Sequence, residues 1–177
     1  HPHRMVHYGH YVFRAPTPLS VIEPGVDTYT GNAIFLEGHR QNSAMFAEQR
    51  QSAGLTRFSS LTPSFLALVL APLFIILIGY GSVSREREAG TLTLLLSQGT
   101  TRWQLMSGKL LALITASGLF LLPLLLACFY VAFSSESVLV VLLFSLSYAV
   151  YFLLWAAVVT ACSALFEKSS VSFTMLI

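Results

Sequence analysis

Charged side chains are scarce in this chain. Asp, Glu, Lys and Arg make up 10% of its 177 residues, against about 25% in ordinary soluble domains. Three long stretches hold none of them, at residues 58–84, 110–135 and 137–166. Each stretch is longer than the roughly 20 apolar residues that a helix needs to cross a bilayer core. The scarcity of charge therefore excludes an ordinary water-soluble domain and predicts three complete membrane helices.

Cysteines and recognisable catalytic patterns are equally rare. The two cysteines, Cys128 and Cys162, lie inside apolar stretches, so they are expected to be small buried side chains rather than a disulfide framework. The sequence has no G-x-x-x-x-G-K-[ST] nucleotide-binding loop, no catalytic triad and no paired membrane carboxylates. Since the apolar stretches lack Asp, Glu, Lys and Arg, a proton-driven transporter is disfavoured. We expect no enzyme activity, no cofactor bound by this chain and no nucleic-acid partner.

The composition divides the chain at about residue 60. Residues 1–60, the predicted extracytoplasmic domain, hold all five histidines and a Pro-rich segment expected to be extended or turning. An amphipathic helix is expected there from about Gly31 to Arg50. Residues 61–177 are the predicted transmembrane domain, embedded in the lipid bilayer. Its helices are expected at about 62–83, 103–133 and 137–166, with a truncated fourth from 169. The predicted fold is an all-α polytopic membrane protein, a helical bundle preceded by a small, mostly helical or irregular domain.

The connection between the first two expected membrane helices carries four of the five basic residues of the predicted transmembrane domain. It holds four basic residues: Arg85, Arg87, Arg102 and Lys109. The next connection, Ser134–Ser137, has one acid and no base. Lysine and arginine concentrate on the cytoplasmic side of membrane proteins. The pattern therefore places residues 84–105 in the cytoplasm and residues 1–60 outside it.

Small residues recur at four-residue spacing in two of the expected helices. They are Gly108, Ala112 and Ala116 in one helix, and Ala157 and Ala161 in the other. Such rows let helix backbones approach closely in lipid, although Gly and Ala are common in membrane helices anyway. We expect these rows to take part in helix–helix packing.

Residues 84–105, called the elbow below, have the features of a docking segment. Four alternating charges follow an apolar helix, and Arg85 and Glu88 are spaced to pair on one helix face. The apolar run Leu92–Leu96 is too short to cross a bilayer, and Trp103 is expected at interface depth. Such an elbow suits contact with a cytoplasmic partner. The alternative is an ordinary charged loop that anchors the topology.

The order of residues in the elbow carries a resemblance. The run Glu86-x-Glu88-x-Gly90-Thr91-Leu92, followed by Ser97, Arg102 and Gly108-Lys109, resembles the signature of ABC-2 type transporter permeases. The resemblance implies the membrane-spanning subunit of an ATP-driven exporter in the bacterial inner membrane, paired with a second permease copy. A separate cytoplasmic ATP-binding subunit would hold ATP and Mg. Coupling to that subunit is assigned to Arg85, Glu86, Glu88, Gly90, Thr91, Leu92, Arg102 and Lys109. The Gly99-Thr100-Thr101 turn departs from the Pro-containing turn of many relatives, which leaves its shape open.

A second resemblance concerns residues 1–60. Segments 7–14, 23–26, 29–31 and 37–42 resemble the extracytoplasmic insert of a bacterial ABC-2 subgroup, a domain of unknown function termed DUF3526. That insert follows the first membrane helix, so helix 62–83 would be the second helix of the parent protein. A first residue other than Met and an apolar run that stops at Ile177 also indicate a fragment without its first and last membrane helices.

The histidines of the first domain suggest other possibilities. His3, His7, His10 and His39 are candidate metal ligands, because imidazole suits Zn, Cu or Ni. No C-x-x-C or H-E-x-x-H pattern accompanies them, so solvated or hydrogen-bonded histidines are the alternative. A membrane-anchored sensor or assembly factor with an outer interaction domain is the alternative function. A neighbouring gene for an ATP-binding cassette, as opposed to a kinase or regulator, would separate the two functions.

Overall fold

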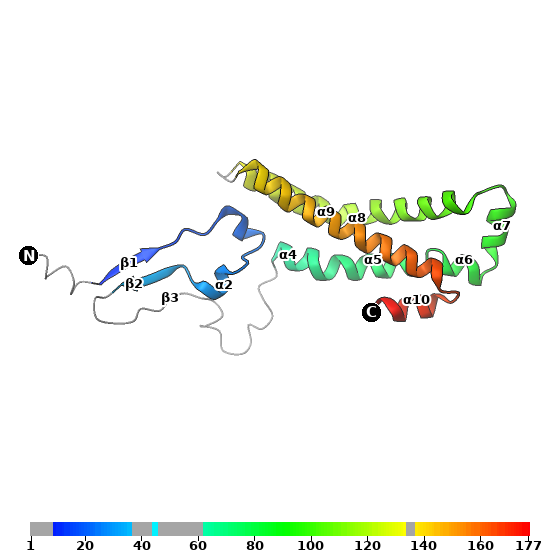
Figure 1. Ribbon diagram of the computed structural model, residues 1–177, viewed down its shortest axis with the longest axis horizontal. Coiled ribbons are helices and arrows are strands. Elements are labelled where there is room, and N and C mark those ends of the chain that lie inside the picture. Colours follow the sequence, from blue (N-terminus) through cyan, green and yellow to red (C-terminus); the bar gives the residue numbers. More distant parts are fainter. Residues whose placement is uncertain (1–8, 37–43, 46–61, 134–136) are drawn as a thin grey trace, which may run out of the picture.

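The computed structural model describes residues 9–36, 44–45, 62–133 and 137–177. The molecule is elongated, with a small sheet at one end and a bundle of helices along the rest (Figure 1). Below, the end of the bundle near the sheet is called the sheet end, and the opposite end is called the elbow end.

The sheet is antiparallel, and its strands lie in the order β1-β2-β3. The strands are β1 (His10–Phe13), β2 (Ala33–Leu36) and β3 (Ala44–Met45). Tyr11 lies opposite Phe35, and the centroids of their rings are 4.8 Å apart. A 3₁₀ helix, η1 (Pro18–Val21), and α2 (Asp27–Thr30) connect β1 to β2. A cross-strand aromatic contact therefore holds the long pair of this small sheet together.

The helix predicted from Gly31 to Arg50 is wrong over residues 33–36 and 44–45, which form β2 and β3. Gly31 has a φ of 73°, a conformation that favours glycine and turns the chain after α2. The following Ile34 and Phe35 favour strands. The spacing of apolar residues within this segment could not show the pairing with β1. The other residues of the predicted helix beyond residue 36 lie outside the described residues.

Among the described residues, three helical segments are long and apolar enough to cross a membrane: Pro63–Glu88, Arg102–Ala132 and Val138–Leu165. The first consists of α4 (Pro63–Phe65), a π-helical segment η3 (Leu66–Leu70), α5 (Ala71–Gly79) and α6 (Ser84–Glu88). The others are α8 (Arg102–Ala132) and α9 (Val138–Leu165), followed by the short α10 (Ser169–Leu176). The predicted all-α polytopic membrane fold is confirmed.

Pro72 explains the irregular start of the first span. It has no N–H group, so the carbonyl of Leu68, four residues earlier, lacks its usual helical partner. The hydroxyl of Tyr151 on α9 donates a hydrogen bond to that carbonyl at 2.9 Å. A neighbouring helix thus satisfies the group that proline leaves free, as membrane helices require.

The core of the bundle has two clusters of buried apolar side chains. The cluster at the sheet end includes Leu124, Cys128 and Phe152, and it is joined by Ile22 from residues 9–36, called the N-terminal segment below. The cluster toward the elbow end contains Ile75, Ile76, Leu113, Ala156 and Val159. Burial of Cys128 agrees with the expected small hydrophobic role, whereas Cys162 is only partly buried.

The predicted rows of small residues lie mostly away from these clusters. Gly108, Ala112 and Ala161 are exposed, and Ala116 and Ala157 are half-buried. A Cβ added at Gly108 would meet no atom within 4 Å. Close approach of helices within the described bundle occurs instead at Gly79, which faces α8 and α9. The contribution of the two rows to helix packing stays a prediction.

Candidate functional site

The elbow forms the turn between the first and second spans. From α6 the chain passes through Gly90 into α7 (Thr91–Ser97), and through Gly99 into α8. Gly90 and Gly99 have φ values of 72° and 91°, which residues with side chains rarely adopt. Helix α7 lies across the elbow end, between α6 and α8 (Figure 1). The chain therefore leaves the first span at α6, crosses the end of the bundle in α7 and returns along α8.

A buried hydroxyl group holds the break between α5 and α6. Oγ of Ser163 on α9 accepts hydrogen bonds from the backbone N–H groups of Val83 and Ser84, at 2.9 and 3.2 Å. Ser84 and Ser163 are both fully buried. These N–H groups stand near the start of α6, where a helix lacks internal acceptors. Ser163 thereby fixes α6 against the last turn of α9.

Arg87 ties α6 to the end of α9. Its guanidinium donates hydrogen bonds to the carbonyl oxygens of Ala164 and Phe166, at 2.8 and 3.4 Å. The last carbonyl groups of a helix lack partners and carry partial negative charge, so a cation there is favourable. The positive charge that was predicted to mark topology therefore also caps a helix.

Glu88 ties α6 to the start of α10. Its carboxylate accepts a hydrogen bond from the backbone N–H of Ser169 at 3.0 Å and one from the Ser169 hydroxyl at 2.8 Å. Ser169 is the first residue of α10, where a negative charge is favourable. Glu88 acts as a helix cap supplied by a distant part of the chain.

Glu86 ties α6 to α8 through an ion pair with Lys109. The carbonyl of Glu86 also accepts a hydrogen bond from the Thr91 hydroxyl at 3.1 Å, which closes the turn into α7. The predicted pairing of Arg85 with Glu88 is wrong. Arg85 instead lies over the ring of Tyr80, 4.7 Å from its centroid, and donates to the Tyr80 hydroxyl.

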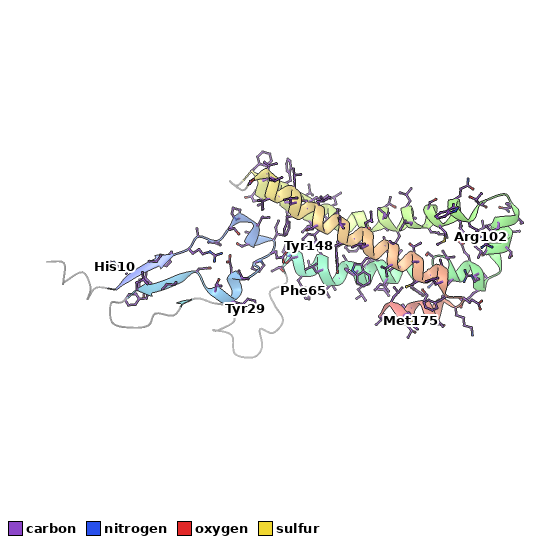
Figure 2. All side chains as sticks on the ribbon, viewed as in Figure 1. His10, Tyr29, Phe65, Arg102, Tyr148 and Met175 are labelled. Atoms are coloured by element: carbon purple, nitrogen blue, oxygen red, sulfur yellow. The ribbon has the colours of Figure 1, made fainter. Side chains whose placement is uncertain are left out.

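A cavity of about 270 Å³ lies at the elbow end, between α7, the first turns of α8 and the end of α9. Its lining residues are Val83, Arg87, Leu92, Leu96, Arg102, Leu105, Met106 and Ala164. Leu92 and Leu96 line the cavity from α7, whereas Leu94 on the same helix is exposed. Figure 2 shows Arg102 at the elbow end of the bundle, where α8 begins.

The start of α8 is set by a capping box that sequence reasoning overlooked. The Thr101 hydroxyl accepts a hydrogen bond from the backbone N–H of Gln104, and the Gln104 side chain accepts one from the N–H of Thr101. The Thr-x-x-Gln spacing was a readable signal for it. The Gly99-Thr100-Thr101 turn therefore supplies the N-cap of α8, at the place where many relatives have a Pro-containing turn.

The structure thus brings together most of the residues predicted for coupling. Glu86, Glu88 and Lys109 make contacts between helices, Gly90 and Thr91 form a turn, and Leu92 and Arg102 line the cavity. Ser163, Ser169 and Tyr80 were not predicted, because their contacts depend on the fold.

The histidine prediction finds little support among the described residues. Of the four candidates, His10 lies exposed in β1, and His3, His7 and His39 lie outside the described ranges. Within those ranges, no group of three or more His, Cys, Asp or Glu side chains is arranged to hold a metal ion.

Comparisons with known proteins identify the family. The family model described as "ABC-2 family transporter protein" matches residues 19–177. Searches of curated proteins and of solved structures find no significant match. The family match spans all three membrane-crossing segments and the elbow, together with part of the N-terminal segment. The chain therefore belongs to the ABC-2 family of transporter proteins and is a membrane permease component of an ABC transporter.

Proposed function

We propose that the elbow receives a separate cytoplasmic ATP-binding subunit and passes its movement to the membrane helices. The proposal rests on one observation: three successive residues of α6 each contact a different helix. Glu86 reaches α8, Arg87 reaches α9 and Glu88 reaches α10. A displacement of α6 must therefore move all three helices or break these contacts.

The contacts refine the roles that the family resemblance assigns. The carboxylates of Glu86 and Glu88 are used within the chain, so we propose that they transmit movement rather than touch the partner. The exposed face of α7 and the start of α8 offer the docking surface instead. Leu94 is 59% exposed there and Trp103 is 86% exposed. Tryptophan is among the residues that most often dominate the binding energy of a protein interface.

The remaining assignments come from the distribution of charge in the sequence and from the family resemblance. We propose that the elbow lies in the cytoplasm of a bacterial cell, that residues 1–60 lie outside the inner membrane as a DUF3526-like insert, and that a second permease copy completes the pathway. ATP and Mg would be bound by the partner subunit. Export of an unidentified substrate is the proposed direction, and the exposed residues Gly108 and Ala112 are available to a second chain.

A charge exchange tests the transmission of movement. Glu86→Lys and Lys109→Glu should each lower the stimulation of ATP hydrolysis by the permease several-fold, because like charges then face each other between α6 and α8. The double variant should recover most of the stimulation. The measurement is the ATPase rate of the co-purified complex relative to that of the ATP-binding subunit alone.

Glu167→Lys is the matched control, since Glu167 is exposed in the connection between α9 and α10. It makes the same charge change beside the elbow without touching the ion pair, and it should keep the stimulation. If both single variants kept full stimulation, or if the double variant were no better than either, the proposed transmission through α6 would be wrong.

A further inference from the structure

We propose that the cavity at the elbow end binds one anionic lipid, with its phosphate on Arg102 and Arg87 and part of its acyl chain against the leucines. The proposal concerns the membrane rather than the ATP-binding subunit, so it stands independently of the proposed function. It rests on the charge, the shape and the depth of the cavity.

The charge of the lining is entirely positive. Among the lining residues, two are arginines and none is acidic. A guanidinium carries five N–H donors, and the two carbonyl contacts of Arg87 occupy only part of its set. Arg102 is exposed and is the first residue of α8, where the helix dipole adds further positive potential. An arginine at that helix end is stabilised when an anion lies beside it.

The rest of the lining is apolar. Leu92 and Leu96 come from α7, and Leu105 and Met106 come from α8. A small polar anion would leave these side chains unused, whereas a phospholipid offers both a phosphate and a chain. The volume of about 270 Å³ is below the range of about 300–1,000 Å³ that is usual for whole small-molecule ligands. It suits one part of a larger amphiphile whose remaining chain stays in the membrane.

The depth of the cavity agrees with a lipid headgroup. Helix α8 has 31 residues, so it is about 46 Å long at 1.5 Å per residue and exceeds a hydrocarbon core of about 30 Å. The charge-free part of α8 begins only at Leu110, so the first two turns of the helix, which start with Arg102, are expected outside the hydrocarbon core. A lipid phosphate of the same leaflet would then lie within reach of both arginines.

A protein partner fits the cavity less well. Leu92 and Leu96 face the bundle, whereas Leu94 faces away from it and is available to a docking subunit. A lipid in the cavity would therefore contact the side of α7 opposite to the one that carries Leu94.

Native mass spectrometry of the full chain provides the test. The protein, purified in an uncharged detergent and freed of lipid, is titrated with phosphatidylglycerol and with phosphatidylcholine of the same chains. We expect one saturable binding site for phosphatidylglycerol, with a higher affinity than for phosphatidylcholine. Arg102→Gln should lower the affinity for phosphatidylglycerol roughly tenfold through loss of a charged hydrogen bond. Met106→Trp, which fills the cavity and keeps both charges, should weaken it as well.

Lys168→Gln is the matched control, because Lys168 is an exposed cation at the same end of the bundle and does not line the cavity. Equal losses in Arg102→Gln and Lys168→Gln would show a general surface attraction and overturn the proposal. Equal affinity for the two lipids would also overturn it. If inorganic phosphate displaced the lipid at matching concentrations, the cavity would be a general anion site, and the proposal of a lipid site would be overturned. Displacement by the ATP-binding subunit, with cross-linking to Met106→Cys, would assign the cavity to a protein partner instead.

Discussion

At Gly79, the lack of a side chain lets α5 lie directly against two neighbouring helices. A Cβ built there would stand 2.5 Å from Cγ1 of Val159 and 2.7 Å from Cδ2 of Leu113. Both partners are buried in the cluster toward the elbow end, where packing leaves little room to move. Gly79 also ends α5, just before the turn that leads into α6. Its packing therefore supports the position of the elbow.

Gly79→Ala should destabilise the protein, although alanine is the better helix former. Overpacking of a filled core costs about 1–3 kcal/mol, which outweighs a gain in helix propensity of up to about 1 kcal/mol. Gly118→Ala on α8 is the control, since a Cβ there would meet no atom within 4 Å. Thermal unfolding in detergent, followed by circular dichroism, should show a lower midpoint for the first variant and an unchanged or higher one for the second. Equal midpoints would contradict the close approach at Gly79.

At the same scale, the sequence shows which residue types matter in the elbow but not what they contact. The motif Glu86-x-Glu88-x-Gly90 is readable in the sequence. Ser163 and Ser169 lie about 80 residues further along the chain and carry no motif of their own. Their function appears only once α9 and α10 are folded beside α6, because the hydroxyl of a serine in a membrane helix usually bonds to its own backbone.

Helix α10 depends on an acceptor from another element. Its N-terminal N–H groups have few partners of their own, and Lys168 at the N-cap position makes no side-chain capping bond. Glu88 supplies the missing acceptor through Ser169. The contact joins α6 to the helix that follows the third span, so the stability of α10 reports on the position of the elbow. Figure 2 shows Met175 of α10 lying back along the bundle.

Glu88→Ala should loosen the start of α10. Loss of a helix cap costs about 1 kcal/mol, which corresponds to roughly fivefold faster exchange of amide hydrogens at the first turn if exchange follows local opening. Hydrogen–deuterium exchange with mass spectrometry measures this effect on peptides covering Ser169–Leu176. Glu167→Ala is the control: Glu167 lies in the connection between α9 and α10, and its loss should leave the exchange unchanged. Protection that stays the same in Glu88→Ala would show that the contact does not hold α10.

The elements also separate what composition can predict from what it cannot. The three spans follow from charge-free length alone, because a bilayer imposes one dominant constraint on every helix that crosses it. The break between α5 and α6 does not follow, since it depends on Ser163. The strands β1 and β2 were missed because a short strand is stabilised by a partner distant in sequence, which local periodicity does not contain.

For the molecule as a whole, the N-terminal segment is packed into the bundle rather than merely tethered to it. Ile22 is 1% exposed and belongs to the cluster at the sheet end, and its carbonyl accepts a hydrogen bond from the N–H of Ser64 at 3.2 Å. The hydroxyl of Tyr148 on α9 donates to the carboxylate of Glu23 at 3.0 Å. Figure 2 shows Tyr148 and Phe65 at this end of the bundle. The two ends of the molecule are thus connected through the same helices, α5 and α9.

Ile22→Ala should therefore destabilise the whole protein and not only residues 9–36. Truncating a fully buried isoleucine costs about 2–5 kcal/mol, whereas Val21→Ala, whose side chain is 75% exposed, should cost no more than about 0.5 kcal/mol. The two neighbouring positions differ mainly in burial, so their comparison isolates the docking contact. Thermal unfolding of the helical signal, together with limited proteolysis of residues 9–36, measures both consequences. If Ile22→Ala left the unfolding of the helices unchanged and only exposed the N-terminal segment to protease, that segment would be an attached module. A lower unfolding midpoint would show that the segment and the helices unfold as one unit, so that a change in the N-terminal segment could alter the packing of the helices that reach the elbow.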